Sequence, residues 1–206
     1  GMYDDALRLF EEAGRLDRVN ELLRARGSWD EALTLAEQKD RFHLKSTHYT
    51  YARALVSQGD TEASIAHFEK SGTHRSEVPR TLHDAAQMER LKSYVDEKRD
   101  TSLFKWWAQH CESEGDYDGA LQYYQRAKDY LAIVRVLCFH DKLDNAAAVV
   151  SQCSSRAASH HLAQQYEERG FAKEAVHYYQ RAHRFNHAVR LAKEHGMDAK
   201  LASRAR

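Results

Sequence analysis

Histidine is the residue type with the clearest potential for chemistry, because the chain has 13 histidines and imidazole is a common metal ligand. The closest groupings of possible ligands are His110 with Cys111, Cys138 with His140, and the pair His160 and His161. A metal site on a helix needs ligands four residues apart and a third donor nearby. Neighbouring residues point about 100° apart on a helix, so these groupings converge poorly. We interpret them as structural and expect no bound metal.

The sequence patterns of the common active sites are not seen either. There is no glycine-rich phosphate loop, no serine or cysteine in a nucleophile elbow, and no paired-carboxylate pattern. Acidic and basic residues alternate along the chain, which is typical of solvated helix faces with weak ion pairs. We therefore predict that the protein is not an enzyme and that it has no catalytic residue and no cofactor.

Tryptophan and cysteine admit both a functional and a structural interpretation. Trp106 and Trp107 could form a binding platform, but the repeat described below places Trp107 at a packing position between helices. Cys138 lies in the apolar run 133–139 and fits a small core residue. The three cysteines are odd in number and widely spaced, which indicates no disulfide framework and favours a reducing, cytoplasmic setting.

Composition favours helices and gives no sign of a polyanionic partner. The 206 residues include one proline and nine glycines, and Ala, Leu, Glu, Lys, Arg and Gln are abundant. Basic and acidic residues number 31 each, so the formal net charge is zero. Such a chain has no long-range field to attract nucleic acid or an anionic membrane, and no apolar run is long enough to span a bilayer. We expect no nucleic acid partner and no direct membrane insertion.

A repeated pattern organises the sequence. A small residue recurs at nearly equal intervals, at Ala6, Ser64, Ala120 and Ala175, and we call each interval a repeat. Each small residue is followed by an aromatic residue four positions later and a second small residue seven positions later, which is one face of a helix. Three of them also have an alanine twelve positions earlier: Ala52, Ala108 and Ala163. This spacing matches a degenerate tetratricopeptide (TPR) pattern.

The repeat predicts an all-α fold, a TPR-like αα-hairpin superhelix in the form of a right-handed solenoid. Shorter helical units fill each interval, for example 16–26, 29–38, 130–140 and 143–153. Small residues let neighbouring helices approach closely, and the aromatic residue fills the remaining groove. We expect residues 1–206 to be a single solenoid segment of a longer protein, because helical patterns begin directly after Met2 and continue to the end.

One segment interrupts the helical pattern. Residues 72–78 combine glycine, serine and threonine directly before Pro79. We expect an irregular connection or a small bend near these residues, but no domain boundary. Pro79 suits the first turn of the next helix, where its missing N–H has no cost.

The TPR pattern also predicts a protein-binding groove. In such repeats the first helix of each hairpin lines the concave side, and the positions facing a ligand peptide are Tyr49, Arg53, Lys105, Gln109, Glu112, His160, Gln164 and Glu167. Simple solvent exposure of these residues is the alternative. Pockets for chaperone tails use a lysine and an asparagine where this chain has Tyr49 and Arg53, so that ligand is not expected.

Several stretches resemble a known family in a way that the generic repeat does not explain. They are 43–52, 73–80, 103–109, 120–124, 134–139 and 157–167. In this order they resemble the TPR region of the family of one-hundred-and-forty-kilodalton subunits of intraflagellar transport complex A (IFT-A), over nearly the whole chain. The match includes 73–80, a segment that generic TPR proteins do not share.

The resemblance implies a non-catalytic scaffold that acts in ciliary retrograde transport and helps proteins enter cilia. It implies other IFT-A subunits, and ciliary cargo adaptors, as partners, and a place in the cytoplasm, the cilium or flagellum and the basal body. Members of the family carry two WD-repeat propellers before a long solenoid. A subunit of another vesicle-coat-like machine remains an alternative, as does a helical-repeat RNA-binding protein, although zero net charge and irregular repeats argue against RNA.

A further expectation concerns the ends of the chain. A solenoid segment without its neighbours exposes the apolar faces of its terminal helices. We therefore expect self-association through residues near 3–26 or 184–206.

Overall fold

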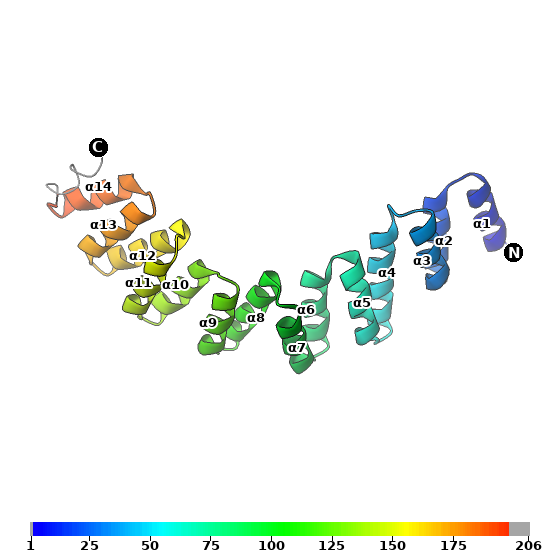
Figure 1. The fold of residues 1–206 in the computed structure, drawn as a ribbon, viewed down its shortest axis with the longest axis horizontal. Coiled ribbons are helices and arrows are strands. Elements are labelled where there is room, and N and C mark those ends of the chain that lie inside the picture. Colours follow the sequence, from blue (N-terminus) through cyan, green and yellow to red (C-terminus); the bar gives the residue numbers. More distant parts are fainter. Residues whose placement is uncertain (1, 198–206) are drawn as a thin grey trace. The chain divides into compact units, whose positions relative to one another are not determined.

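A computed structural model describes residues 2–197 and contains fourteen α-helices and no strand in that range (Figure 1). The helices are α1 (Met2–Glu12), α2 (Leu16–Arg26), α3 (Trp29–Gln38), α4 (Leu44–Ser57), α5 (Thr61–Ser71), α6 (His74–Asp84), α7 (Met88–Lys98), α8 (Thr101–Ser113), α9 (Tyr117–Arg126), α10 (Tyr130–Phe139), α11 (Leu143–Gln152), α12 (Arg156–Glu168), α13 (Ala172–Arg181) and α14 (Phe185–Glu194). The predicted all-α, TPR-like fold is confirmed.

The most extensive helix packing occurs at the three copies of the small–aromatic–small pattern that follow an alanine twelve residues earlier. α4 packs on α5, α8 on α9, and α12 on α13. Their small residues are fully buried, as Ala52 and Ser64 show for the first pair. The aromatic residue of each pattern is buried beside them: Phe68, Tyr124 and Tyr179. Close approach of the helices at small residues leaves a groove that the ring fills, which is why these pairs form hairpins.

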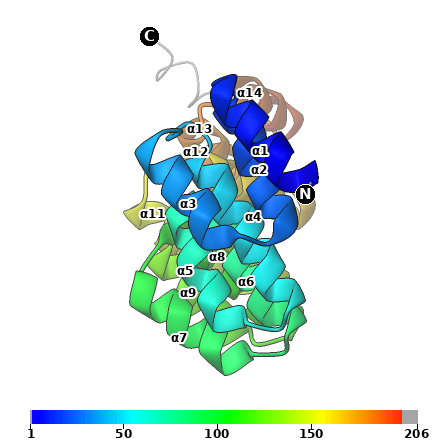
Figure 2. The ribbon, with the colours of Figure 1, turned by 90° about the vertical axis from the view of Figure 1, so that its right-hand side faces the viewer.

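The chain divides into two compact units, residues 1–97 and residues 98–206. In the first, successive helices from α1 to α7 lie side by side in chain order, and Figure 2 shows this row from its α1 end (Figures 1 and 2). One of its apolar clusters is formed by Val19, Leu23 and Ala32, with Leu7 and Phe10 packed against it.

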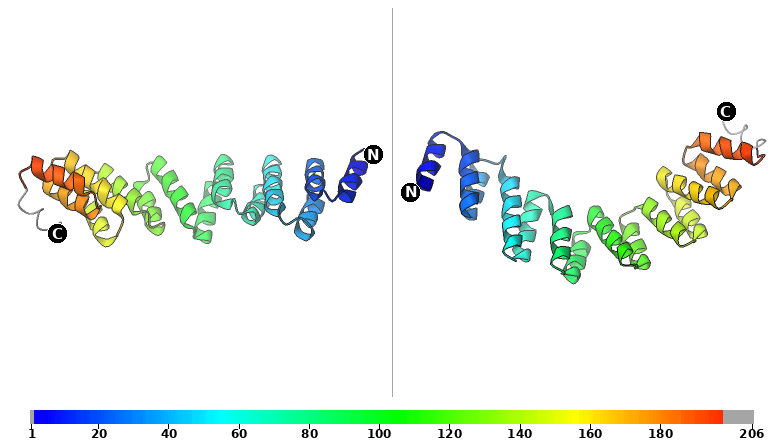
Figure 3. Two further views of the ribbon diagram at one scale, coloured as in Figure 1. Left: turned by 90° about the horizontal axis from the view of Figure 1, so that it is seen from above. Right: turned by 180° about the vertical axis from the view of Figure 1, so that it is seen from behind.

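The second unit repeats the arrangement from α8 to α14 (Figure 3). Its core includes Leu103, Trp107 and Val134. It also includes Tyr124 and Tyr179, the buried rings that fill the grooves of the α8–α9 and α12–α13 hairpins. We call such a ring the aromatic plug of its hairpin. α12 packs against α10, α11 and α13, so this helix is the centre of the C-terminal half of the unit. The predicted burial of Trp107 is correct, and Trp106 beside it is half-buried.

The irregular connection expected at residues 72–78 is wrong for most of its length. Only Gly72 and Thr73 lie outside helices, because α5 ends at Ser71 and α6 begins at His74. Gly72 has a φ of 82°, a left-handed conformation that glycine adopts without strain, and its N–H bonds to the Glu69 carbonyl. A tight helix end at Gly72 thus forms the connection between α5 and α6.

The position of Pro79 also differs from the prediction. It lies inside α6, in the second helical turn rather than the first, and it is buried with Val78 and Leu82. The helix begins earlier than the proline suggests because the Thr73 carbonyl accepts the N–H groups of Ser76 and Glu77. These bonds form the first turn before the chain reaches the proline.

Candidate protein-binding surface

Side chains that could ligate a metal or act as nucleophiles are the first candidates for chemistry in the part of the chain that the structure describes. Among residues 2–197, no group of three or more His, Cys, Asp or Glu could hold a metal ion. All three cysteines are buried. Burial raises the pKa of the Cys138 thiol to about 11, an effect that the nearby charge of Arg169 partly offsets. This thiol is therefore protonated and unreactive at neutral pH.

None of the fourteen described helices has the length and apolar character needed to cross a membrane.

His110, one of the histidines considered as a metal ligand, lies against two aromatic rings. It stacks on Trp106, with 5.8 Å between ring centroids, and tilts against Trp107 at 5.3 Å. These contacts give the histidine and both tryptophans a packing role on α8.

The eight residues predicted to line a groove lie on α4, α8 and α12, the first helices of the three best-packed hairpins. In the first unit, Tyr49 is half-buried against Phe68, with 6.2 Å between ring centroids. Arg53, one turn later, is exposed and lies 3.8 Å from a carboxylate oxygen of Glu77. In the second unit, Gln109 and Gln164 are exposed at matching positions of α8 and α12.

Glu112 is already engaged within the chain. The Tyr124 hydroxyl donates to its Oε2 at 2.8 Å, and the Arg135 guanidinium donates to Oε1 at 2.5 Å and to Oε2 at 2.6 Å. The hydrogen bond from Arg135 is the main cause that holds the pKa of Glu112 below its ordinary value. Burial, followed by the bond to Glu112, raises the pKa of Tyr124 to about 12. We call this three-residue arrangement the Glu–Tyr–Arg latch.

A second latch lies one repeat further along the chain. The Tyr179 hydroxyl donates to Glu167 Oε2 at 2.5 Å, and Arg190 donates to Glu167 Oε1 at 2.6 Å. Each latch ties the first helix of a hairpin to its second helix and to the helix after that. Glu112 and Glu167 therefore order this surface, because their oxygens are committed to bonds within the chain.

The latch could have been found in the sequence, but it was missed. Its spacing of 12 and 23 residues from the glutamate is the same in both copies. The aligned positions of the first unit are Val56, Phe68 and Pro79, which cannot form these bonds. The latch therefore belongs to the second unit.

Lys105 and His160 occupy the same place in the two hairpins of the second unit, but their surroundings differ in charge. Lys105 Nζ lies 2.9 Å from Asp129 Oδ2, so the charge of the lysine is balanced by an ion pair within the chain. The residue equivalent to Asp129 in the next repeat is Arg184. Beside His160 a cation has therefore replaced the carboxylate.

A hollow of about 560 Å³ opens at this second place. Its lining is formed by residues of α12, the turn between α13 and α14, and one residue of α10: Leu131, Arg156, Ala157, His160, His161, Gln164, Ala182, His183 and Arg184. No carboxylate is among them. We call it the cationic hollow. Sequence reasoning had included His160 and Gln164 but had missed Arg156, His183 and Arg184.

The electrostatics of the cationic hollow follow from its lining. Burial lowers the pKa of His160, and the charges of Arg184, His187 and His161 lower it further. Burial and the charge of Arg135 lower the pKa of His161, and the charge of Glu168 raises it by less. Both imidazoles are therefore neutral at pH 7 in the free protein, and the fixed positive charge comes from Arg156 and Arg184.

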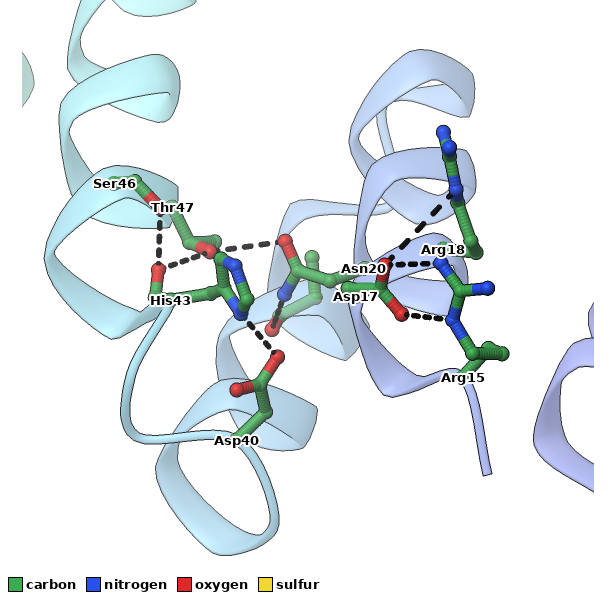
Figure 4. A network of polar contacts seen from close by, with 9 residues as sticks. Arg15, Asp17, Arg18, Asn20, Asp40, His43, Ser46 and Thr47 are labelled. Atoms are coloured by element: carbon green, nitrogen blue, oxygen red, sulfur yellow. Dashed lines mark hydrogen bonds and ion pairs between the residues drawn. The ribbon is translucent and has the colours of Figure 1, made fainter. Parts of the chain in front are cut away.

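The first unit contains a buried polar network of a different kind (Figure 4). The Asn20 side chain, 1 % exposed, donates to the Ala32 carbonyl at 2.9 Å and accepts from the Thr47 hydroxyl at 3.0 Å. At the edge of the network, His43 Nδ1 lies 2.7 Å from a carboxylate oxygen of Asp40. Asn20 thus joins α2, α3 and α4 through satisfied polar groups, which is a structural role.

Comparison with known protein families gives a match that spans the whole chain. The family described as the TPR domain of intraflagellar transport proteins 140 and 172 matches residues 1–206. The match covers all fourteen described helices, the hairpins with their aromatic plugs and both latches. It agrees with the resemblance drawn from the sequence motifs.

Proposed function

Because this chain belongs, over its full length, to the family of TPR domains of intraflagellar transport proteins 140 and 172, we propose that it is a protein–protein interaction scaffold of intraflagellar transport complex A. In this proposal it acts without catalysis in ciliary retrograde transport and helps proteins enter cilia. It works in the cytoplasm, the cilium or flagellum and the basal body, and residues 1–206 belong to one solenoid segment of a longer protein. The observation that carries the proposal is the family match over residues 1–206.

The scaffold acts by presenting ordered helix faces to partners. The α8 and α12 faces have exposed glutamines beside carboxylates that are held in place by the latches. Partners that dock on such faces bury apolar patches inside a polar rim. We propose that Tyr49 and Arg53 belong to a contact surface of the first unit, and that the predicted groove residues of α8 and α12 form a contact surface of the second unit. Glu112 and Glu167 position their neighbours in it.

Binding to purified subunits tests the proposal. The chain is mixed separately with each other subunit of complex A, with ciliary cargo adaptors, and with intraflagellar transport subunits outside complex A. Complex formation is followed by size-exclusion chromatography with light scattering. Stable co-elution with one subunit, or with a ciliary cargo adaptor, supports the proposal and identifies the partner. Co-elution only with intraflagellar transport subunits outside complex A would remove the assignment to complex A, since the family name covers two proteins.

A pair of variants tests the proposed surface. Gln109→Arg combined with Gln164→Arg places two bulky charges on the exposed faces of α8 and α12 and should weaken co-elution at least about tenfold. Gln122→Arg combined with Gln125→Arg is the matched control, because it adds the same two charges at exposed positions of α9, a second helix of a hairpin. Equal loss of binding in both variants, or in neither, would contradict the proposed surface. Circular dichroism verifies that each variant is folded.

A further inference from the structure

We infer that the cationic hollow between α12 and the α13–α14 turn binds an acidic segment of a partner protein. The inference rests on the proposed scaffold function, to which it adds the chemistry of one partner segment. The hollow has room for a few side chains at about 560 Å³, and its fixed charges, Arg156 and Arg184, are both positive. Within residues 2–197, neither arginine forms an ion pair with a carboxylate.

The neighbouring hairpin provides the internal comparison that makes this arrangement informative. There, Lys105 meets Asp129 at 2.9 Å, so the positive charge has a partner within the chain. In the hairpin of α12 the same two places hold His160 and Arg184. Two groups that can both be cationic now face one hollow, and no carboxylate of residues 2–197 lies in its lining, so we assign the balancing carboxylate to a partner. A ligand carboxylate can accept two parallel hydrogen bonds from an arginine, the strongest form of such recognition.

A protein segment fits this hollow better than a nucleic acid or a membrane surface does. Polyanions are held by long basic stripes, and this chain has equal numbers of basic and acidic residues. The hollow itself contributes two fixed positive charges, and the Glu167–Arg190 pair of the same hairpin is internally neutral. Leu131 and the alanines of the lining add apolar contacts for the stems of glutamate side chains.

The histidines make binding dependent on pH. Groups that face His160 and His161 are Arg135 from α10, Glu168 on α12 itself, Tyr179 from α13, and Arg184, His183 and His187 from the following turn and α14. Of these, Arg135, Arg184 and His187 disfavour a protonated imidazole, and Glu168 favours it. A bound carboxylate favours it, so binding takes up protons and the affinity should rise as the pH falls from about 7.5 toward 6.

The test uses the whole chain and a fluorescein-labelled hexaglutamate peptide, with binding followed by fluorescence anisotropy at low ionic strength. Arg184→Asp restores the charge arrangement of the neighbouring hairpin and should weaken binding at least about tenfold. Lys173→Asp, an equal charge change at an exposed site on α13, should leave the affinity within about twofold. Arg156→Gln is a second, milder variant, and it should also weaken binding of the peptide. It keeps the inference testable if Arg184→Asp perturbs the fold.

The outcomes separate this inference from the scaffold proposal. Equal weakening by Arg184→Asp and Lys173→Asp, or no peptide binding at any pH, would overturn the inference. Binding of oligouridine or of anionic phospholipid vesicles that depends on Arg184, with no binding of hexaglutamate, would overturn the assignment to an acidic protein segment. The scaffold proposal fails in a different experiment, the size-exclusion test, if no subunit co-elutes with the unchanged chain.

Discussion

At the scale of single residues, the hydrogen bonds to Glu112 and Glu167 are the most specific interactions of the second unit. Each carboxylate accepts bonds from a buried tyrosine and from an arginine on a third helix. Hydrogen bonds to charged groups contribute more to stability than bonds between neutral groups. The two arginines are partly exposed, so solvent screening weakens the stabilisation that their bonds to the glutamates provide. We expect the tyrosine bond to be the more stabilising half of each latch.

Replacing Tyr124 by phenylalanine tests this expectation. Tyr124→Phe should lower the free energy of unfolding by about 1–2 kcal/mol in urea denaturation, because it removes a bond to a carboxylate and keeps the ring. The folded protein holds the pKa of Tyr124 at about 12, above the ordinary value near 10. The bond therefore stabilises fully below pH ~10, and this stability is lost as the pH rises to about 12.

The control for this variant is Tyr117→Phe. Tyr117 is half-buried beside His140, and its hydroxyl makes no hydrogen bond within residues 2–197. Its loss should change the free energy of unfolding by less than ~0.5 kcal/mol. Similar values for the two variants would show that the latch adds nothing.

A buried histidine pair predicts acid sensitivity in the first unit. His48 Nδ1 lies 2.9 Å from His67 Nδ1, so one ring must be neutral to accept the hydrogen bond. Burial lowers the pKa of both rings, and each is lowered further by nearby positive charge, including Lys70. The neutral pair thus stabilises the fold above pH ~6.5, the ordinary value of histidine, and this stability is lost as the pH falls below it.

Urea denaturation between pH 8 and pH ~5 measures this effect. The unchanged chain should lose stability over this range more steeply than His67→Gln, which cannot become charged. His195→Gln removes an exposed histidine and should keep the slope of the unchanged chain. A slope that His67→Gln leaves the same would rule out the pair as the acid-sensitive group.

At the scale of elements, the hairpins depend on one aromatic plug each. Phe68 is fully buried between α4 and α5, at the position where α8–α9 and α12–α13 have tyrosines. Because phenylalanine has no hydroxyl, the first hairpin has no latch, and the polar contact described between its helices is the His48–His67 pair. The three hairpins therefore share a shape but differ in polar contacts.

Removing the plug should be costly. Phe68→Ala should lower the free energy of unfolding by about 3–5 kcal/mol, since it leaves a cavity between two closely packed helices. Phe139→Ala is the control, because Phe139 is 75 % exposed and should cost less than ~1 kcal/mol. Chemical denaturation of both variants gives the comparison. A loss under ~1 kcal/mol for Phe68→Ala would mean that the repeat spacing has been placed wrongly.

At the scale of the whole molecule, the first and last described helices leave apolar side chains uncovered. On α1, Met2 is 91 % exposed and Leu9 is 61 % exposed, while Phe185 and Val189 are exposed on α14. Residues 198–206, which belong to the segment expected to self-associate, lie outside the described part of the chain. The expectation that the chain associates with itself therefore depends on α1 and α14.

Light scattering across a range of concentrations measures this association. The mean mass should rise with concentration, and Leu9→Lys or Phe185→Ser should reduce the rise, because each removes an exposed apolar contact. Phe42→Ser is the control, since Phe42 is 88 % exposed but lies between α3 and α4. A mass that stays monomeric at all concentrations would contradict the prediction.

Much of the fold could be predicted from the sequence because its main determinant is local. A small residue, an aromatic residue four positions later and another small residue define a helix face, and Ala120, Tyr124 and Ala127 are all buried as that pattern requires. The start of α6 could not be predicted from the proline, because the bonds that begin this helix go to the Thr73 carbonyl. Backbone bonds of this kind have no side-chain pattern.

The candidate site was harder to predict than the fold. The groove positions followed from the helix face, but the sequence pattern does not show which polar groups are already bonded. Glu112 meets Arg135 only because α10, the helix that follows the hairpin, brings the arginine within hydrogen-bond distance of it. The cationic hollow depends on the difference between Asp129 and Arg184, which is informative only once the two places are known to be equivalent.

The two latches share one spacing, and this has a consequence for how such a gene can change. Tyr124 and Tyr179 lie one repeat apart and play the same part in their hairpins. An in-frame recombination between the two coding segments would delete or duplicate one whole repeat and still join equivalent positions. The arginine of the helix that follows the junction would then meet an equivalent glutamate and tyrosine, and a latch would form there. Domains of this kind can therefore change length in whole steps, and a shorter or longer chain keeps its hairpins intact.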